Sequence, residues 1–184
     1  IKKMISVKNI LKNIRKMIDN ENQNELTTLG KISKENDPFR VLISTILSSR
    51  TKDDITFNAT KRLFEQYKNA KELSKANISN IKRLIKPVAF YKTKPKKIKQ
   101  VAEIIYKDYN NHVPSDINKL LELPLVGRKT ANCVLVYGFR KPAIPVDVHV
   151  HRISNRLGIV KTEIPEETEI ELTKIAKKEY WLQI

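Results

Sequence analysis

Apolar residues recur every three or four positions along most of the chain, which is the spacing of one face of an α-helix. Alternation of apolar and polar residues, which would predict strands, is scarce. The clearest helical stretches are Val7, Ile10, Leu11, Ile14 and Ile18, then Leu63, Phe64 and Tyr67, and then Ile98, Val101, Ala102, Ile105 and Tyr106. The pattern predicts an all-α protein of about nine or ten helices joined by polar loops.

Helix start signals agree with this periodicity. Asp37-Pro38 predicts a helix that runs through Ser48, because aspartate caps helices and proline fits their first turn. Thr51–Asp54 resembles a capping box, and Pro95 stands where a first helical turn would begin.

Length and composition exclude several classes of protein. The 184 residues allow one domain or two small ones, and the 40% hydrophobic and 30% charged content is typical of a soluble globule. No apolar stretch reaches the roughly 18 residues of a membrane span, so we expect no membrane partner. We also expect a monomer. The single Cys133 excludes an internal disulfide and a multi-cysteine metal site. Because the sequence shows no apolar signal segment, we expect a reducing interior, the cytoplasm or nucleoid.

The charge balance points to a polyanion as the partner. The chain has 36 Lys and Arg against 20 Asp and Glu, a net charge of +16. The excess lies in residues 1–112, which carry 25 basic and 11 acidic side chains, against 11 and 9 in residues 113–184. A run of lysines comprises Lys92, Lys94, Lys96, Lys97 and Lys99. It could bind DNA phosphates through Lys94, Lys96 and Lys97. The alternative is a solvated helix face, which is the more common role of such a run.

Residues 116–138 read as a helix-hairpin-helix. A short helix over Asp116–Glu122 meets the turn Leu123–Gly127, and a second helix begins near Arg128. A hairpin at a helix N-terminus holds a phosphate through backbone donors without reading bases. A chance turn between two helices is the alternative. We expect the DNA contacts here to be Leu125, Val126, Gly127 and Arg128.

Four segments together resemble the endonuclease III family of helix-hairpin-helix DNA glycosylases. Leu123–Ala131 is similar to the family's L-P-G-V-G-R-K-T-A, and Pro142–Leu157 to its P-x-x-x-V-D-T-H-V-x-R-x-x-N-R-L. Asp37–Asp53 is similar to D-P-F-x-x-L-I-x-x-x-L-S-x-Q-x-x-D, and Ala89–Lys94 to G-[FL]-Y-x-x-K. The resemblance covers roughly residues 30 to 184.

The resemblance implies two helical domains with an active-site cleft between them. A helical barrel over 31–141 would hold the hairpin, and a second helical domain would combine 1–30 with 142–184. The implied activity is base excision repair by a bifunctional DNA N-glycosylase and abasic-site lyase, acting on oxidised pyrimidines or abasic sites in double-stranded DNA. A non-catalytic helix-hairpin-helix DNA-binding module remains the alternative.

Lys129 is the predicted nucleophile. To release a base and cleave the strand, an unprotonated amine must attack C1′ of the sugar and form a Schiff base. We expect the helix dipole, the neighbouring Arg128 and desolvation against DNA to disfavour the ammonium form of Lys129. The alternative is a second cation that binds phosphate.

Asp147 precedes a helix predicted to end near Gly158, so it reads as an N-cap. The resemblance adds the role of catalytic acid, which would stabilise positive charge on the sugar. His149 and His151 could instead ligate a metal in a phosphate-ester hydrolase, but two histidines at i and i+2 do not share a helix face. We expect no metal site; the histidines should pack at the hinge or contact DNA backbone, with His149 as a DNA contact.

Three positions carry the remaining expectations. Phe90 matches the family's wedge, which fills the gap left by the extruded nucleotide, with a core aromatic as the alternative. Arg50 stands where the family usually has the glutamine that probes the orphaned base, and Leu125 replaces the first glycine of the hairpin. If φ of Leu125 is positive, the leucine costs about 1 to 2 kcal/mol.

The chain ends at Trp181-Leu-Gln-Ile184. In many family members a Trp-Leu at this point is followed by four cysteines that hold a 4Fe-4S cluster. Because the chain starts without Met and its last stretch is apolar and uncapped, we expect a fragment. A cluster is expected only if the natural chain continues past Ile184.

Overall fold

The structure is a computed structural model, and it describes residues 9–10, 12–13, 16, 28–32 and 36–183. These residues form ten α-helices, one π-helix and one 3-10 helix, with no strand among them. The prediction of an all-α protein with nine or ten helices is therefore confirmed. Of the apolar positions predicted for an N-terminal helix, Val7, Leu11, Ile14 and Ile18 lie outside the described residues.

The chain divides into two compact units. One is Leu26–Phe139, and the other is Ile1–Glu25 with Arg140–Ile184. The assignment of 31–141 to a helical barrel, and of 1–30 with 142–184 to a second domain, stays a prediction.

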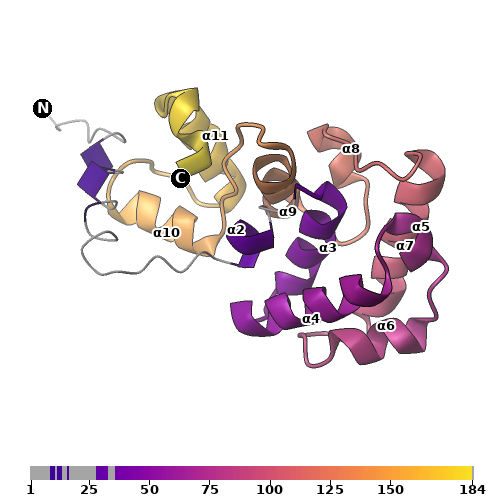
Figure 1. Ribbon diagram of the computed structural model, residues 1–184. Helices are drawn as coiled ribbons and strands as arrows, with labels where there is room; N and C mark the ends of the chain where they lie inside the picture. Colours follow the sequence, from indigo (N-terminus) through magenta and orange to yellow (C-terminus); the bar gives the residue numbers. More distant parts are fainter. Residues whose placement is uncertain (1–8, 11, 14–15, 17–27, 33–35, 184) are drawn as a thin grey trace, which may run out of the picture. The chain divides into compact units, whose positions relative to one another are not determined.

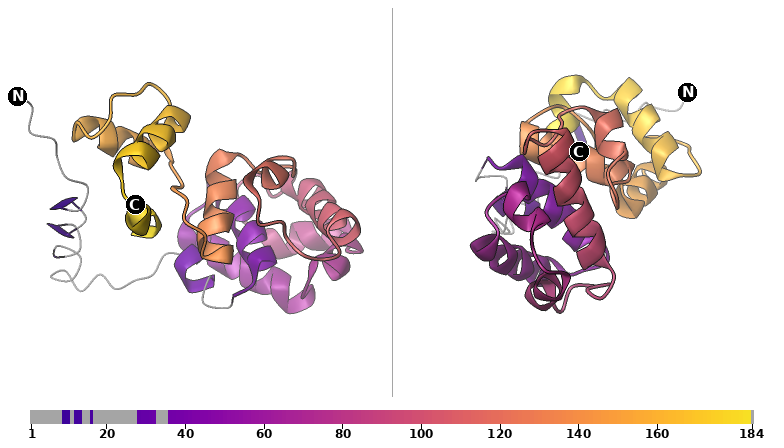
Figure 2. Two further views of the ribbon diagram at one scale, coloured as in Figure 1. Left: turned by 90° about the horizontal axis from the view of Figure 1, so that it is seen from above. Right: turned by 90° about the vertical axis from the view of Figure 1, so that its right-hand side faces the viewer.

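The Leu26–Phe139 unit holds most of the helices, which can be followed in Figure 1 and from two further sides in Figure 2. They are α2 (Thr28–Ile32), α3 (Pro38–Ser48), α4 (Asp53–Gln66), α5 (Ala70–Ser74), α6 (Ile78–Ile85), α7 (Lys94–Asp108), α8 (Ile117–Leu121), α9 (Arg128–Cys133) and the π-helix η2 (Val134–Gly138).

Helix α3 supplies the centre of this core. Its apolar residues are at most 2% exposed between Val41 and Leu47, because α2, α4, α7, α9 and η2 all pack against it. Helix α7 packs on α5 and α6, and its buried positions Ile98, Val101, Ala102 and Ile105 are those of the predicted helical stretch. Cys133, the single cysteine of the chain, is buried in α9, as expected for a small core residue.

Two of the three predicted helix starts are confirmed. Asp37 caps α3, because its Oδ1 accepts hydrogen bonds from the amides of Phe39 at 2.9 Å and Arg40 at 3.2 Å. Pro95 lies in the first turn of α7. The capping box at Thr51–Asp54 is wrong: α4 begins at Asp53 after Lys52, which makes no capping hydrogen bond. The Thr51 hydroxyl is occupied elsewhere, as described below.

The second unit contains α10 (Val148–Arg156), α11 (Pro165–Ile175) and the 3-10 helix η3 (Lys178–Gln183). Its small core consists of Ile144, Val146 and Leu172, with the partly buried Val150, Ile159, Val160 and Trp181 packed against it. Polar side chains also join α10 to α11. Asn155 accepts the Thr162 amide at 2.9 Å, and the Thr162 and Thr168 hydroxyls share a hydrogen bond.

Candidate functional site

The helix-hairpin-helix forms as predicted between α8 and α9. Asp116 caps α8 by accepting the amides of Asn118 at 2.9 Å and Lys119 at 3.1 Å. The buried side chains of Leu120 and Leu123 fix the first helix and the turn to the core. The predicted start of the second helix at Arg128 is confirmed, with Gly127 as its N-cap.

The tip of the hairpin turn, at Leu125 and Gly127, is exposed to solvent. Leu125 has φ +63° and is 48% exposed, so the leucine that replaces the family's glycine does adopt the left-handed conformation. Gly127 has an ordinary φ of −92°, and a Cβ built there meets no atom within 4 Å. Neither backbone strain nor internal packing requires glycine at position 127. Because glycine has no side chain, a ligand can approach the backbone closely at this position.

Val126 requires a correction. Its side chain is 7% exposed, and its amide donates to the Leu123 carbonyl at 3.2 Å. Val126 therefore holds the turn against the core, and neither its side chain nor its amide serves as the predicted DNA contact.

Arg128 and Lys129 lie in the first turn of α9, and both side chains are exposed. The positive end of the helix dipole lies at this turn. The predicted nucleophile is thus on the surface, directly after the open hairpin.

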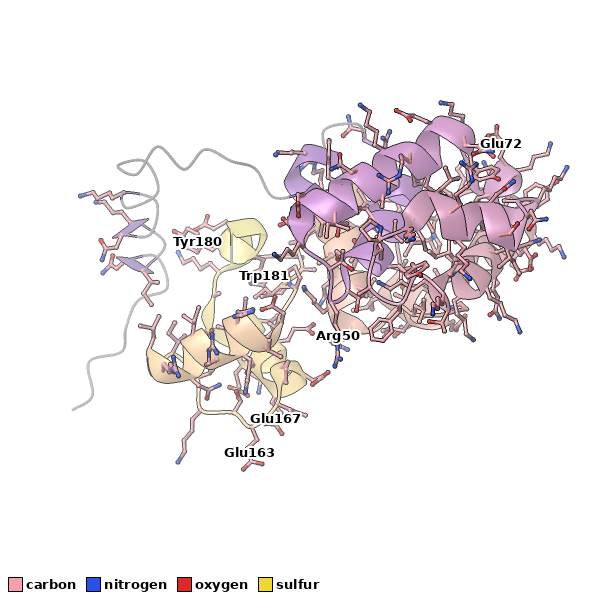
Figure 3. The ribbon with its side chains drawn as sticks, turned by 90° about the horizontal axis from the view of Figure 1, so that it is seen from below. Arg50, Glu72, Glu163, Glu167, Tyr180 and Trp181 are labelled. Carbon is pink, nitrogen blue, oxygen red and sulfur yellow. The ribbon has the colours of Figure 1, made fainter. Side chains whose placement is uncertain are left out.

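Arg50 and Phe90 share an unusual backbone geometry. Their φ angles are +58° and +59°, in the left-handed region that residues other than glycine rarely adopt. Both side chains are exposed, Phe90 by 55%, so the alternative of a core aromatic at Phe90 is wrong. Figure 3 shows the Arg50 side chain projecting from the surface of its unit. Non-glycine residues held in this region cluster at ligand-binding sites.

A hollow of about 700 Å³ brings these segments together within the Leu26–Phe139 unit. The end of α3 contributes Ile46 and Ser49, and the hairpin contributes Leu125 and Thr130. The remaining lining residues come from the turn before α7 and its first turn: Phe90, Lys92, Thr93, Lys94, Lys96 and Lys97. The hollow therefore combines apolar walls with a lysine rim, which suits a base and its phosphate.

The lysine run does not act as one face. Lys92, Lys96 and Lys97 are exposed, whereas Lys94 is only 6% exposed. The Lys94 Nζ donates to the backbone carbonyls of Leu47 and Ser49, each at 3.0 Å, and burial lowers the pKa of Lys94 to about 8. The prediction that Lys94 binds DNA phosphate is wrong, because its amine is used inside the protein.

In the other unit, Asp147 caps α10 as predicted. Its Oδ1 accepts the amides of His149 at 2.9 Å and Val150 at 3.0 Å, and its side chain is half-buried. These two hydrogen bonds hold the carboxylate at the helix N-terminus. The helix ends at Arg156, two residues before the predicted end.

The two histidines of α10 have different surroundings. His149 is exposed, with Nδ1 3.3 Å from an Arg152 nitrogen, whereas His151 Nδ1 lies 2.6 Å from the Thr168 hydroxyl. Among the described residues, no group of three or more His, Cys, Asp or Glu side chains could hold a metal ion.

Comparison with known proteins decides the family. Residues 43–178 match the HhH-GPD superfamily base excision DNA repair proteins. The chain is 53% identical over 148 residues to endonuclease III of Thermotoga maritima, which covers 80% of this chain and 70% of that protein. The chain belongs to the endonuclease III family.

More distant relatives and solved structures agree with this family. Endonuclease III of Bacillus subtilis is 38% identical over 146 residues, which cover 78% of this chain and 66% of that protein. A structure of a non-covalent endonuclease III–DNA complex matches with a TM-score of 0.84 at 33% identity, over 96% of this chain and 79% of that one. A trapped endonuclease III–DNA covalent intermediate matches with a TM-score of 0.76 at 32% identity, over 94% and 81%.

An iron–sulfur cluster does not fit the residues of this chain. A four-iron cluster needs four cysteine ligands, and the sequence contains only Cys133, which is buried in α9.

In the part of the chain that the structure describes, no helix is long and apolar enough to cross a membrane.

Sequence reasoning missed the residues that hold the exposed ones in place. The Thr51 hydroxyl accepts the Ala89 amide at 3.1 Å, and Thr130 lines the hollow. No local pattern marks the Thr51 contact, since its partner Ala89 lies 38 residues away in sequence. The positive φ of Arg50 and Phe90 also lacks the glycine or asparagine that normally signals it.

Proposed function

We propose that this chain is a bifunctional DNA N-glycosylase and abasic-site lyase that removes oxidised pyrimidines in base excision repair. The observation that carries the proposal is the exposed Lys129 amine in the first turn of α9, directly after the hairpin of an endonuclease III family member. A module that only bound DNA would need cations there, but not a nucleophile.

Lys129 would act through its unprotonated amine. Its lone pair attacks C1′, the bond from C1′ to the base nitrogen breaks, and the base leaves with that electron pair and takes up a proton. The attached nitrogen then loses a proton, the C1′–O4′ bond breaks, and O4′ takes up a proton, so that the sugar ring opens to an iminium. This iminium makes the C2′ proton acidic. Loss of that proton and cleavage of the C3′–O bond then release the 3′ phosphate by β-elimination.

Asp147 would serve the same reaction as a carboxylate. Positive charge develops on the sugar as the base leaves, and a fixed negative group stabilises it. The two amide hydrogen bonds from α10 hold Oδ1 in place, which favours a preorganised carboxylate. Its role as an N-cap and this catalytic role are compatible.

Double-stranded DNA with damaged bases or abasic sites is the proposed partner. The backbone of the hairpin at Leu125 and Gly127, with the Arg128 side chain, would hold a phosphate. Phe90 would enter the stack beside the extruded nucleotide, while Arg50 faces the unpaired base. Lys96, Lys97 and His149 would add backbone contacts. A substrate of this kind would be met at the chromosome, so we expect the protein in a reducing cell interior.

Borohydride trapping tests the proposal. Borohydride reduces the iminium, so wild-type protein incubated with abasic-site DNA should give a stable covalent complex. Lys129→Ala should give none while its DNA affinity falls less than about tenfold, because only one cation is lost. The neighbouring Arg128→Ala is the matched control, since it removes a charge and keeps the amine. Wild-type protein that binds but is not trapped would be a DNA-binding module.

A further inference from the structure

One buried cation has no part in the chemistry proposed above. The Lys94 amine donates to two backbone carbonyls at the end of α3, a helix far from Lys94 in sequence. Helix C-termini attract cations, and the two carbonyls of Leu47 and Ser49 are among those that a helix end leaves without helical partners.

The same residue also fixes the turn that carries Phe90. The Lys94 backbone amide donates to the Phe90 carbonyl at 2.9 Å, and the Thr93 amide donates to it at 3.0 Å. Lys94 is therefore bonded at its backbone to Phe90 and at its side chain to Ser49, the residue before Arg50.

A second link joins the same two turns on their other side. The Thr51 hydroxyl accepts the Ala89 amide at 3.1 Å and donates to the Ser49 carbonyl at 3.4 Å. Residues on both sides of Arg50 are thus bonded to the segment around Phe90. These bonds surround the two left-handed residues, whose φ angles are +58° and +59°.

We propose that Lys94 is a positioning residue, which holds the Arg50 and Phe90 turns in the arrangement that lets both side chains enter duplex DNA. This inference rests on the proposed function. Without the amine, the carbonyls of Leu47 and Ser49 lose their charged donor, and the link through Thr51 no longer has a charged bond beside it to hold Arg50 in its left-handed conformation. The two turns then adopt ordinary backbone angles, and the exposed side chains no longer point into the stack together.

The effect should depend on the substrate. Duplex DNA requires gap filling, whereas an abasic site in a flexible single strand does not. In single-turnover assays, Lys94→Met should slow base excision from a duplex with one thymine glycol about tenfold, since hydrogen bonds to a charged donor are lost. Strand cleavage at a pre-formed abasic site in single-stranded DNA should change less than about twofold.

Lys107→Met is the matched control, because Lys107 is an exposed lysine in the last turn of the same helix. It should leave both rates unchanged. A double variant separates positioning from general stability: adding Lys94→Met to Phe90→Ala should slow duplex excision by less than Lys94→Met does in the wild type, because the Phe90 part of the loss is shared and only the Arg50 part remains. Thr51→Val should reproduce the duplex-specific loss if Lys94→Met does not fold.

A binding assay makes the result independent of catalysis. In a duplex with a tetrahydrofuran abasic analogue and 2-aminopurine opposite it, insertion of Phe90 and Arg50 should raise the fluorescence of 2-aminopurine. Wild-type protein and Lys107→Met should both give this rise, and Lys94→Met should not at saturating protein. Equal rate losses on both DNA substrates, multiplicative losses in the double variant, or an undiminished fluorescence rise would overturn the positioning role. Failure of wild-type trapping would instead refute the proposed function, and the fluorescence assay would still decide on Lys94.

Discussion

Replacing Leu125 by glycine tests whether the tip of the hairpin is strained. Leu125 holds φ at +63°, where a side chain crowds the following carbonyl. For a residue other than glycine this conformation costs about 1 to 2 kcal/mol, and Leu125→Gly removes that cost.

Two opposing effects reduce the gain. Glycine makes the unfolded chain more flexible, which costs about 0.5 to 1 kcal/mol. The leucine is 48% exposed, so deleting it loses about half the value of a buried leucine, or roughly 1 kcal/mol. Leu125→Gly should therefore change the free energy of unfolding by between a gain of about 0.5 kcal/mol and a loss of about 1 kcal/mol.

Leu121 provides the comparison. It is the last residue of α8 in the same hairpin, it is 36% exposed, and it is not among the residues with positive φ. Leu121→Gly loses helix propensity and apolar burial without relief of strain, so we expect a loss of about 2 to 2.5 kcal/mol. Urea unfolding followed by circular dichroism measures both variants. Equal losses for the two leucines would refute the strain at Leu125.

Three further predictions concern the exposed Phe90, the exposed Lys96 and Lys97, and the buried Lys94. Phe90→Ala should slow excision from duplex DNA about tenfold more than cleavage of a single-stranded abasic site, as measured in single-turnover assays; equal losses would deny Phe90 the wedge role. Replacing Lys96 and Lys97 by glutamine should flatten the slope of log K against log salt by about 1.8, whereas Lys107→Gln should not, and an unchanged slope would make the run a solvated face. Because burial lowers the pKa of Lys94 to about 8, the native state holds fewer protons than the unfolded state between this pH and about 10.4. Wild-type stability should therefore rise relative to Lys94→Met between pH 7 and pH 10 in urea unfolding, and a constant difference would contradict the lowered pKa.

Helix boundaries were predictable where the signal is local. Asp37, Asp116 and Asp147 each cap a helix that the sequence places within two residues of its start, because the capping bond joins a side chain to amides two and three residues on. Apolar spacing likewise identified the buried face of α7. Both signals need only a few neighbouring residues.

Long-range packing decided what the sequence could not. Within one lysine run, Lys94 is buried and Lys96 is exposed, although the two have the same chemistry. The difference arises because the end of α3 lies within reach of the first turn of α7, a contact between residues 47 positions apart. A long-range contact also explains why Thr51 does not cap α4. Its hydroxyl accepts a hydrogen bond from the Ala89 amide, which lies 38 residues away in sequence.

The strained backbone of this protein is concentrated where DNA is expected to bind. Among the described residues, the positive φ angles outside glycine and asparagine occur at Arg50, Phe90, Leu125 and Arg140. Phe90 and Leu125 line the hollow, and Arg50 follows the lining residue Ser49. Each such residue costs of order 1 to 3 kcal/mol, so the conformation persists only where surrounding contacts enforce it. Those contacts come from the buried ends of α3 and α7 and from the buried Leu123 and Val126 of the hairpin. The core therefore stabilises three exposed side chains in conformations that their own turns would not select, and it presents them before any DNA arrives.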